Sequence, residues 1–208
     1  AKTTMKSFPM CSNCSNEYET ITDRRFHAQP VACNLCGPQY ELILKGNNKS
    51  NNISTIIERL SQCIDKGGVV LVKGLGGMHL ACDAFNEAAV EKLRNLKKRD
   101  GKPFAIMFGD IENLKQYAEV DAIEEKSLLS WRRPIVLLEK KKSAGRPSFP
   151  DNLNAGLNLL GVMLPYMPVH YLLFRKLKTK AIVLTSGNFS NEPILIDNTD
   201  CIEKFASV

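Results

Sequence analysis

The order of apolar and polar positions predicts alternating strands and helices beyond residue 53. Four short, continuous apolar runs have the length and composition of strands buried inside a sheet: 69–72, 104–108, 135–138 and 181–184. Five segments are predicted as helices, the third and fourth as short surface helices: 53–64, 86–98, 110–117, 121–129 and 169–177. This alternation predicts an α/β domain with at least four core strands, whose order and direction the sequence does not reveal.

A polar, turn-rich stretch without apolar periodicity separates this domain from the start of the chain. Residues 46–52 read Gly-Asn-Asn-Lys-Ser-Asn-Asn, which is typical of a linker. We therefore expect a small cysteine-rich subdomain over residues 1–46 and a larger domain over residues 53–208.

Composition restricts the function classes only loosely. The 208 residues are 44% hydrophobic and 24% charged, as in ordinary globular proteins. The net charge of +6 permits binding of nucleotides or nucleic acid but requires neither. No run is long and apolar enough to span a bilayer, and no secretory signal is visible, so we expect a cytoplasmic protein without a membrane partner.

Two Cys-x-x-Cys pairs predict a structural zinc site. Cys11 and Cys14 form the first pair, and Cys33 and Cys36 follow after eighteen residues. Each two-residue gap lets both sulfurs face one ion, so four thiolates can surround a tetrahedral zinc. Redox chemistry does not explain two matched pairs, and a cytosolic setting disfavours disulfides. Because four cysteines fill the site, His27 is not expected as a ligand, and the zinc would stabilise the fold without catalysing a reaction.

A lysine and three glycines follow the first predicted strand, in the order Lys73, Gly74, Gly76 and Gly77, with a leucine after Gly74. Glycine leaves the backbone N–H groups accessible, and a neighbouring cation favours an anion such as phosphate or carbamate. A tight strand-to-helix turn with a solvated lysine explains the same residues equally well. The motif alone leaves both interpretations open.

A basic segment, Lys-Lys-Arg-Asp-Gly-Lys-Pro over residues 97–103, joins a predicted helix to a predicted strand. Its cations could complement the helix dipole and remain in water. Because the segment leads directly into a core strand, we favour phosphate binding by Lys97, Arg99 and Lys102.

A second polar turn follows the last predicted strand, with Thr185, Ser186 and Asn188 around a glycine. Two hydroxyls and an amide can bind phosphate oxygens or a carbamoyl group, and the alternative is a turn that satisfies its own backbone. Since this turn and both basic segments adjoin predicted core strands, we expect the three to meet in one site for a triphosphate.

Several motifs together resemble the HypF family of hydrogenase-maturation carbamoyltransferases. The cysteine pairs, with DRRFHAQP between them, resemble that family's second zinc finger. The larger domain is similar to its YrdC-like domain, which implies a twisted mixed sheet flanked by helices. The matching stretches occur in the family's order: KGLGGMHLACDA (73–84), KKRDGKPFAIM (97–107), RRPIVLL (132–138), GVMLPYMPVHYLL (161–173) and LTSGNFSNEPI (184–194).

This resemblance implies ATP-dependent formation of carbamoyl-adenylate from carbamate that is derived from carbamoyl phosphate. In the family, the carbamoyl group then passes to HypE and becomes a cyanide ligand of nickel–iron hydrogenase. It implies structural zinc, and ATP with magnesium. The catalytic cations would be Lys73, Lys97, Arg99 and Lys102. The nucleotide would bind at Gly74, Gly76, Gly77, Thr185, Ser186 and Asn188.

The chain also departs from the family pattern. Family proteins carry an acylphosphatase-like domain and a first zinc finger before this region, and a transferase domain after it. The YrdC-like domain ends early near Val208, and Ala1 stands where an initiator methionine would be. We therefore expect a fragment that does not complete the carbamoyl transfer.

Two other functions remain as alternatives. One is a threonylcarbamoyl-adenylate synthase of tRNA modification, since YrdC-type domains also occur there. The other is an RNA-binding zinc module, which the zinc site and the positive charge suggest. Basic residues scattered among strand ends and an aromatic content of 7% argue against nucleic acid.

Overall fold

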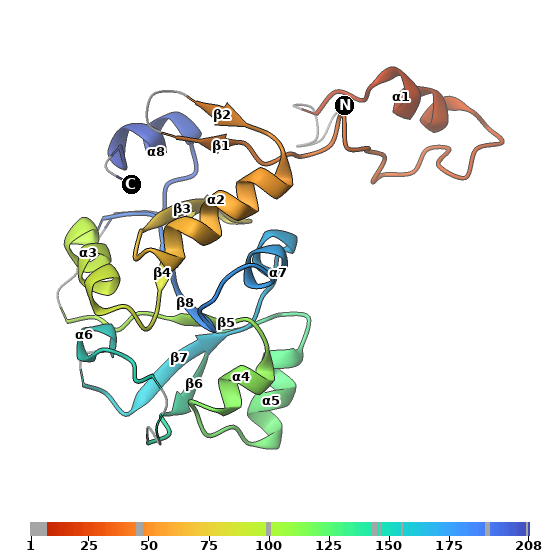
Figure 1. Ribbon diagram of the computed structural model, residues 1–208. Helices are drawn as coiled ribbons and strands as arrows, with labels where there is room; N and C mark the ends of the chain where they lie inside the picture. Colours follow the sequence, from red (N-terminus) through yellow and green to blue (C-terminus); the bar gives the residue numbers. More distant parts are fainter. Residues whose placement is uncertain are drawn as a thin grey trace. The chain divides into compact units, whose positions relative to one another are not determined.

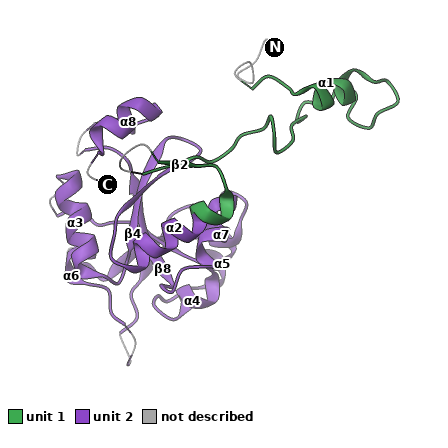
Figure 2. Cartoon of the chain, turned by 45° about the horizontal axis from the view of Figure 1, so that its top comes forward, with its two compact units in different colours: residues 1–56 green, residues 57–208 purple. Residues whose placement is uncertain are grey.

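The computed structural model describes residues 8–44, 48–98, 101–142, 145, 147–154, 156–189, 192–206 and 208. The chain divides into two compact units, Ala1–Ile56 and Ile57–Val208 (Figure 2). No helix in the described ranges is long and apolar enough to cross a membrane.

The first unit contains little regular structure. Helix α1 (Ser12–Glu19) begins directly after Cys11, and β1 (Leu42–Ile43) pairs antiparallel with β2 (Lys49–Ser50). The sequence analysis predicted none of these elements. Only Cys14 is buried on α1, so the helix has no apolar stripe by which a sequence pattern could reveal it.

The second unit is built on a six-stranded mixed sheet in the order β3-β4-β8-β5-β7-β6 (Figure 1). All neighbouring strands are antiparallel except β5 and β7. The strands are β3 (Val70–Lys73), β4 (Met78–Asp83), β5 (Ile106–Phe108), β6 (Val136–Glu139), β7 (Leu159–Met163) and β8 (Ala181–Ser186). The expected fold class, a mixed sheet flanked by helices, is confirmed.

Helices cover the sheet, and their apolar side chains pack with those of the strands in the core. They are α2 (Ile53–Asp65), α3 (Glu87–Lys97), α4 (Ile111–Lys115), α5 (Ala122–Leu129), α6 (Asp151–Asn154), α7 (Pro168–Phe174) and α8 (Asn198–Lys204). The main core cluster joins residues of α3 to α6 and α8 with strand residues such as Leu80 and Phe108. Helices α2 and α7 bury further apolar side chains outside this cluster, including Ile64 and Leu173.

Strand β4 is the main correction to the sequence analysis. The segment 73–77 is the turn of a β3–β4 hairpin, not a turn from a strand into a helix. Strand β4 lies between β3 and β8 and is largely buried, so its sequence, Met-His-Leu-Ala-Cys-Asp, shows neither clean alternation nor β-branched residues.

Replacing Leu80 with alanine should lower the free energy of unfolding by about 2–5 kcal/mol, because Leu80 is fully buried in the interior strand β4. Leu137→Ala on the edge strand β6, where the side chain is 66% exposed, should change it by less than about 0.5 kcal/mol. Urea unfolding of both variants in one buffer measures the difference. Equal losses would contradict the interior position of β4 in the sheet.

Candidate functional site

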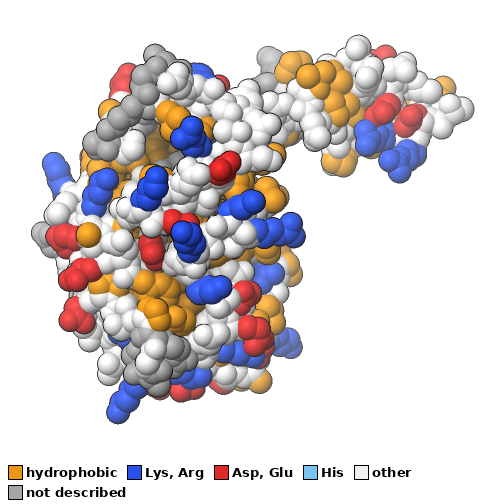
Figure 3. Space-filling model, viewed as in Figure 1, with side chains coloured by type: hydrophobic (Ala, Val, Ile, Leu, Met, Phe, Trp, Pro, Cys, Tyr) orange, Lys and Arg blue, Asp and Glu red, His pale blue; other side chains and the backbone are white. Residues whose placement is uncertain are grey.

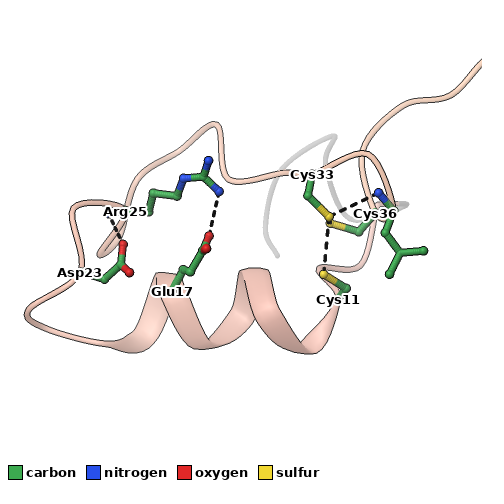
Figure 4. A network of polar contacts seen from close by, with 7 residues as sticks. Cys11, Glu17, Asp23, Arg25, Cys33 and Cys36 are labelled. Carbon is green, nitrogen blue, oxygen red and sulfur yellow. Dashed lines mark hydrogen bonds and ion pairs between the residues drawn. The ribbon is translucent and has the colours of Figure 1, made fainter.

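The four cysteines of the first unit form one cluster suited to a metal, and Figure 4 shows three of them, Cys11, Cys33 and Cys36. Their Sγ atoms all lie within 4.8 Å of one another. The Sγ of Cys33 lies 3.7 Å from that of Cys11 and 3.8 Å from that of Cys36. A tetrahedral zinc with Zn–S bonds of about 2.3 Å requires sulfur–sulfur distances of about 3.8 Å. Both of these distances match a tetrahedral zinc site, and the whole cluster is compact enough to hold one ion.

Local backbone structure positions the two cysteine pairs. Helix α1 starts after Cys11 and places Cys14 one turn later, on its buried side. In the second pair, Gly37 N donates to Cys33 O at 2.8 Å, and a side chain at Gly37 would put its Cβ only 2.8 Å from that oxygen. Backbone hydrogen bonds lower the pKa of both Cys33 and Cys36, that of Cys36 to about 6. For these two cysteines this favours the thiolate, the form that zinc binds, whereas burial raises the pKa of Cys14 to about 12.

The loop between the pairs is held by contacts outside the cluster. Arg25 forms an ion pair of 2.7 Å with Glu17 of α1, and its backbone N–H donates to Asp23 (Figure 4). His27 stacks with Phe26 and Tyr18, at centroid distances of 4.2 and 5.0 Å. These contacts stabilise the loop without supplying further metal ligands.

One zinc ion per chain is expected, and Cys14→Ser should reduce the zinc content of dialysed protein from about one to well below one, because a structural site needs all four thiolates. Cys63→Ser, which changes a half-buried cysteine outside the cluster, is the matched control. Elemental analysis of reduced protein measures both. A zinc content near zero in the unmodified chain would contradict the assignment.

In the second unit, the turn before β4 and the turn after β8 lie side by side. His79 of β4 is the register partner of Ser186 of β8, and Gly187 N donates to Met78 O at 2.6 Å. A side chain at Gly187 would place its Cβ 2.8 Å from that of Met78. The structure thus brings two of the three predicted polar segments into contact.

A third segment, residues 194–198, crosses both turns. Met78 N donates to Leu195 O at 2.8 Å, and Leu195 N donates to Gly187 O at 3.2 Å. Gly77 has a φ of +146°, and a Cβ there would lie 2.9 Å from Ile194 and from Leu195 O. The crossing therefore requires a glycine at position 77, independently of any contact between Gly77 and a ligand.

Lys73 stands at the exposed end of β3. Its Nζ donates to Ile196 O at 3.0 Å and to Asn198 Oδ1 at 2.7 Å. Gly74 N closes the hairpin turn on Gly77 O at 2.7 Å, whereas a side chain at Gly76 would meet nothing within 4 Å. The ammonium group of Lys73 thus binds two oxygens and is also accessible from solvent.

Lys97, the last residue of α3, is only 1% exposed. Its Nζ donates to Ser186 O and to both the backbone and side-chain oxygens of Asn188, the latter two at 2.9 Å. Ser186 Oγ lies 2.5 Å from Asn188 Oδ1, and Thr185 beside them is buried in β8. Lys97 therefore contacts the predicted nucleotide turn itself, and a phosphate contact by its ammonium stays a prediction.

The remaining basic residues belong to the segment before β5. Lys102 is exposed, and Leu184 N donates to Ala105 O at 3.1 Å, which places this segment beside the end of β8. Arg99 lies outside the described residues.

Two histidines near this site were missed by the sequence analysis. The ring of His79 packs against Gly74, and burial lowers the pKa of His79, with a smaller contribution from Lys97. His170 of α7 is buried, and burial together with the charge of His79 lowers the pKa of His170 to about 4. Both side chains are therefore neutral near pH 7. His79 lies inside the KGLGGMHLACDA stretch. Had β4 been predicted as a strand beside the glycine turn, His79 would have been recognised as a residue near the site.

A shallow hollow elsewhere in the second unit has no part in this arrangement. It is lined by Gln116, Tyr117, Lys140 to Lys142 and Pro147 to Phe149, none of which is a predicted site residue. The face drawn in Figure 3 shows lysine and arginine side chains scattered over this unit without a continuous basic stripe.

Gly187→Ala should lower the free energy of unfolding by about 1–3 kcal/mol, because the new methyl group would collide with the backbone of Met78. Gly76→Ala adds the same group where nothing lies within 4 Å and should cost less than about 0.5 kcal/mol. Thermal or urea unfolding compares the two variants. An unchanged stability in Gly187→Ala would rule out the close crossing of β4 and the turn after β8.

A mixed sheet with a lysine–glycine hairpin beside a hydroxyl turn defines an α/β domain, here joined to a four-cysteine zinc finger. The chain belongs to the Sua5/YciO/YrdC family: the family described as "Telomere recombination" matches residues 62–208. The "HypF finger" family matches residues 10–43, in agreement with the resemblance seen in the sequence.

Individual relatives agree with this assignment. Carbamoyltransferase HypF of Rhodobacter capsulatus is 43% identical over 208 residues, which is 100% of this chain and 27% of the relative. A crystal structure of full-length HypF in the phosphate- and nucleotide-bound form matches with a TM-score of 0.83 and 46% identity, covering 100% of this chain and 26% of that one. This chain therefore spans about a quarter of the length of these relatives.

A more distant relative belongs to the alternative class. The putative threonylcarbamoyl-AMP synthase of Methanocaldococcus jannaschii is 28% identical over 149 residues, covering 70% of this chain and 67% of that protein.

Proposed function

We propose that this chain forms carbamoyl-adenylate as one part of a HypF carbamoyltransferase. The observation that best supports this proposal is the structural match of the whole chain to HypF in the phosphate- and nucleotide-bound form. A carbamate oxygen attacks the α-phosphorus of ATP, the bond from that phosphorus to the β-phosphate oxygen breaks, and pyrophosphate leaves. The carbamate, derived from carbamoyl phosphate, is already anionic, so the reaction needs no general base.

The contribution of the protein is to position the reactants and to stabilise charge on the phosphate oxygens. Lys73 is exposed and can exchange the oxygens of Ile196 and Asn198 for those of a phosphate. Ser186 and Asn188, held at the end of β8, supply hydroxyl and amide groups to the nucleotide. The glycines of the hairpin turn offer backbone N–H groups, and Lys97, Arg99 and Lys102 add positive charge.

Cofactors and partners follow from the same proposal. Zinc stabilises the finger, and magnesium binds through the oxygens of ATP. Acylphosphatase-like and transferase domains of the complete protein supply the carbamate and deliver the carbamoyl group to HypE. Seven free cysteines suit the reducing cytoplasm.

Lys73→Met should weaken ATP binding about 10- to 100-fold, because a charge-assisted hydrogen bond to phosphate is lost. Lys126→Met, an exposed lysine on α5, is the matched control and should bind as the unmodified chain does. Isothermal titration calorimetry measures both affinities, and circular dichroism checks the fold. Identical ATP affinity in all three proteins would falsify the assignment of Lys73.

Pyrophosphate release distinguishes the competing functions. With carbamate supplied from ammonium bicarbonate, the proposal expects release of pyrophosphate from ATP that threonine does not stimulate. Release that requires threonine plus bicarbonate would instead identify a threonylcarbamoyl-adenylate synthase. Tight RNA binding with a steep salt dependence, and no affinity for ATP, would identify a nucleic-acid module.

A further inference from the structure

Arg94, on the last turns of α3, contacts the segment that carries Lys102. Its Nη1 donates to Lys102 O at 3.1 Å. Its other nitrogens donate to two carbonyls of α6, Nε to that of Asn152 and Nη2 to that of Leu153 at 3.2 Å. The guanidinium carbon lies 4.8 Å from the ring centre of Phe104. One side chain thus joins α3, α6 and the segment before β5.

The segment before β5, which Arg94 contacts at Lys102, is also held by hydrogen bonds at Phe104 and Ala105. Phe104 is 2% exposed, and its N–H donates to Leu153 O at 3.0 Å. The next residue, Ala105, accepts from Leu184 N of β8. In the register of β5 with β8, Ile106 faces Val183, so the residues before Ile106 run alongside the end of β8 that leads to Ser186. The carbonyl bound by Arg94 belongs to the residue whose side chain is proposed to bind phosphate.

Arginine is suited to this task in a way that lysine is not. The planar guanidinium has five N–H donors in a fixed fork and can serve carbonyls from separate elements at the same time. Lysine has one ammonium nitrogen and cannot reach all three carbonyls from the same position. The three hydrogen bonds of Arg94 described above all go to backbone oxygens.

We infer that Arg94 is a positioning residue for the adenylating site, which fixes the backbone at Lys102 and thereby aims that lysine at the ligand. The inference rests on the proposed ATP site and adds a residue that acts through Lys102. Arg94→Lys then releases the Lys102 carbonyl while keeping the charge. The position of Lys102 is lost, and its contribution to ligand binding falls with it.

A double-mutant cycle with Lys102→Met tests this role in the zinc-loaded chain. We expect Arg94→Lys and Lys102→Met each to weaken ATP binding by about 5- to 10-fold, and the double variant by little more than the stronger single one. Lys92→Met, an exposed lysine on the same helix, should leave the affinity unchanged. Factors that multiply in the double variant would overturn the inference, because a purely structural loss or a direct ligand contact would act independently of Lys102.

Hydrogen exchange at the Phe104 amide provides a second readout that needs no ligand. Arg94→Lys should accelerate this exchange several-fold, and Lys92→Met should not. Unchanged exchange in Arg94→Lys would show that Arg94 does not hold the segment. If the unmodified chain binds no ATP, the proposed function fails, and the exchange experiment still decides whether Arg94 fixes the backbone at Lys102.

Discussion

The close approach of Gly187 to Met78 is the constraint on which the site depends. The hydrogen bond from Gly187 N to Met78 O, with no side chain between them, sets the distance between the β3–β4 hairpin turn and the turn after β8. Any larger residue would separate the two turns, and with them Lys73 and Ser186. A ligand that contacts both groups therefore requires the glycine, although the glycine itself supplies no chemistry. The close approach of the two backbones therefore limits which residue can occupy position 187 more strictly than any side-chain contact in the site does.

The burial of Lys97 reinforces the same arrangement. An ammonium group removed from water is costly unless oxygens surround it, and here one residue pair, Ser186 and Asn188, supplies three. The cation therefore cannot keep its place unless the turn keeps its shape, and the turn gains charge-assisted hydrogen bonds in return. Helix α3 contributes Arg94 to the segment before β5 in a similar way. One helix thus holds the two loops on either side of the end of β8.

The sequence predicted features that depend on local pattern and failed where partners come from distant positions. Short apolar runs identified β3, β5, β6 and β8, and helical spacing identified α2, α3 and α7. The paired spacing of the cysteines was sufficient to predict the zinc cluster. Strand β4 was missed because a central strand needs no alternation, and its role is defined only by neighbours on both sides.

The candidate site was predictable to the same extent. Lysines, glycines and hydroxyls at strand ends were recognised because they are local in sequence. The contacts of Lys97 span about ninety residues and those of Arg94 with α6 nearly sixty, so no motif could indicate these partners. Of the segment over residues 194–198, only Ile194 belongs to a recognised stretch, and the crossing of this segment over both turns depends on the folded sheet.

Burial separates two lysines to which the sequence assigned the same role. Both lysines donate from their ammonium groups to backbone and asparagine oxygens. The side chain of Lys97 is buried, whereas that of Lys73 is exposed to solvent. If Lys97 moved to a phosphate, the oxygens of Ser186 and Asn188 would lose its ammonium donor while they remain shielded from water, which is costly. Moving Lys73 leaves the oxygens of Ile196 and Asn198 free to bind water instead. The exchange of partners that ligand binding would require is therefore less costly at Lys73 than at Lys97, and the buried Lys97 is better suited to hold the turn after β8.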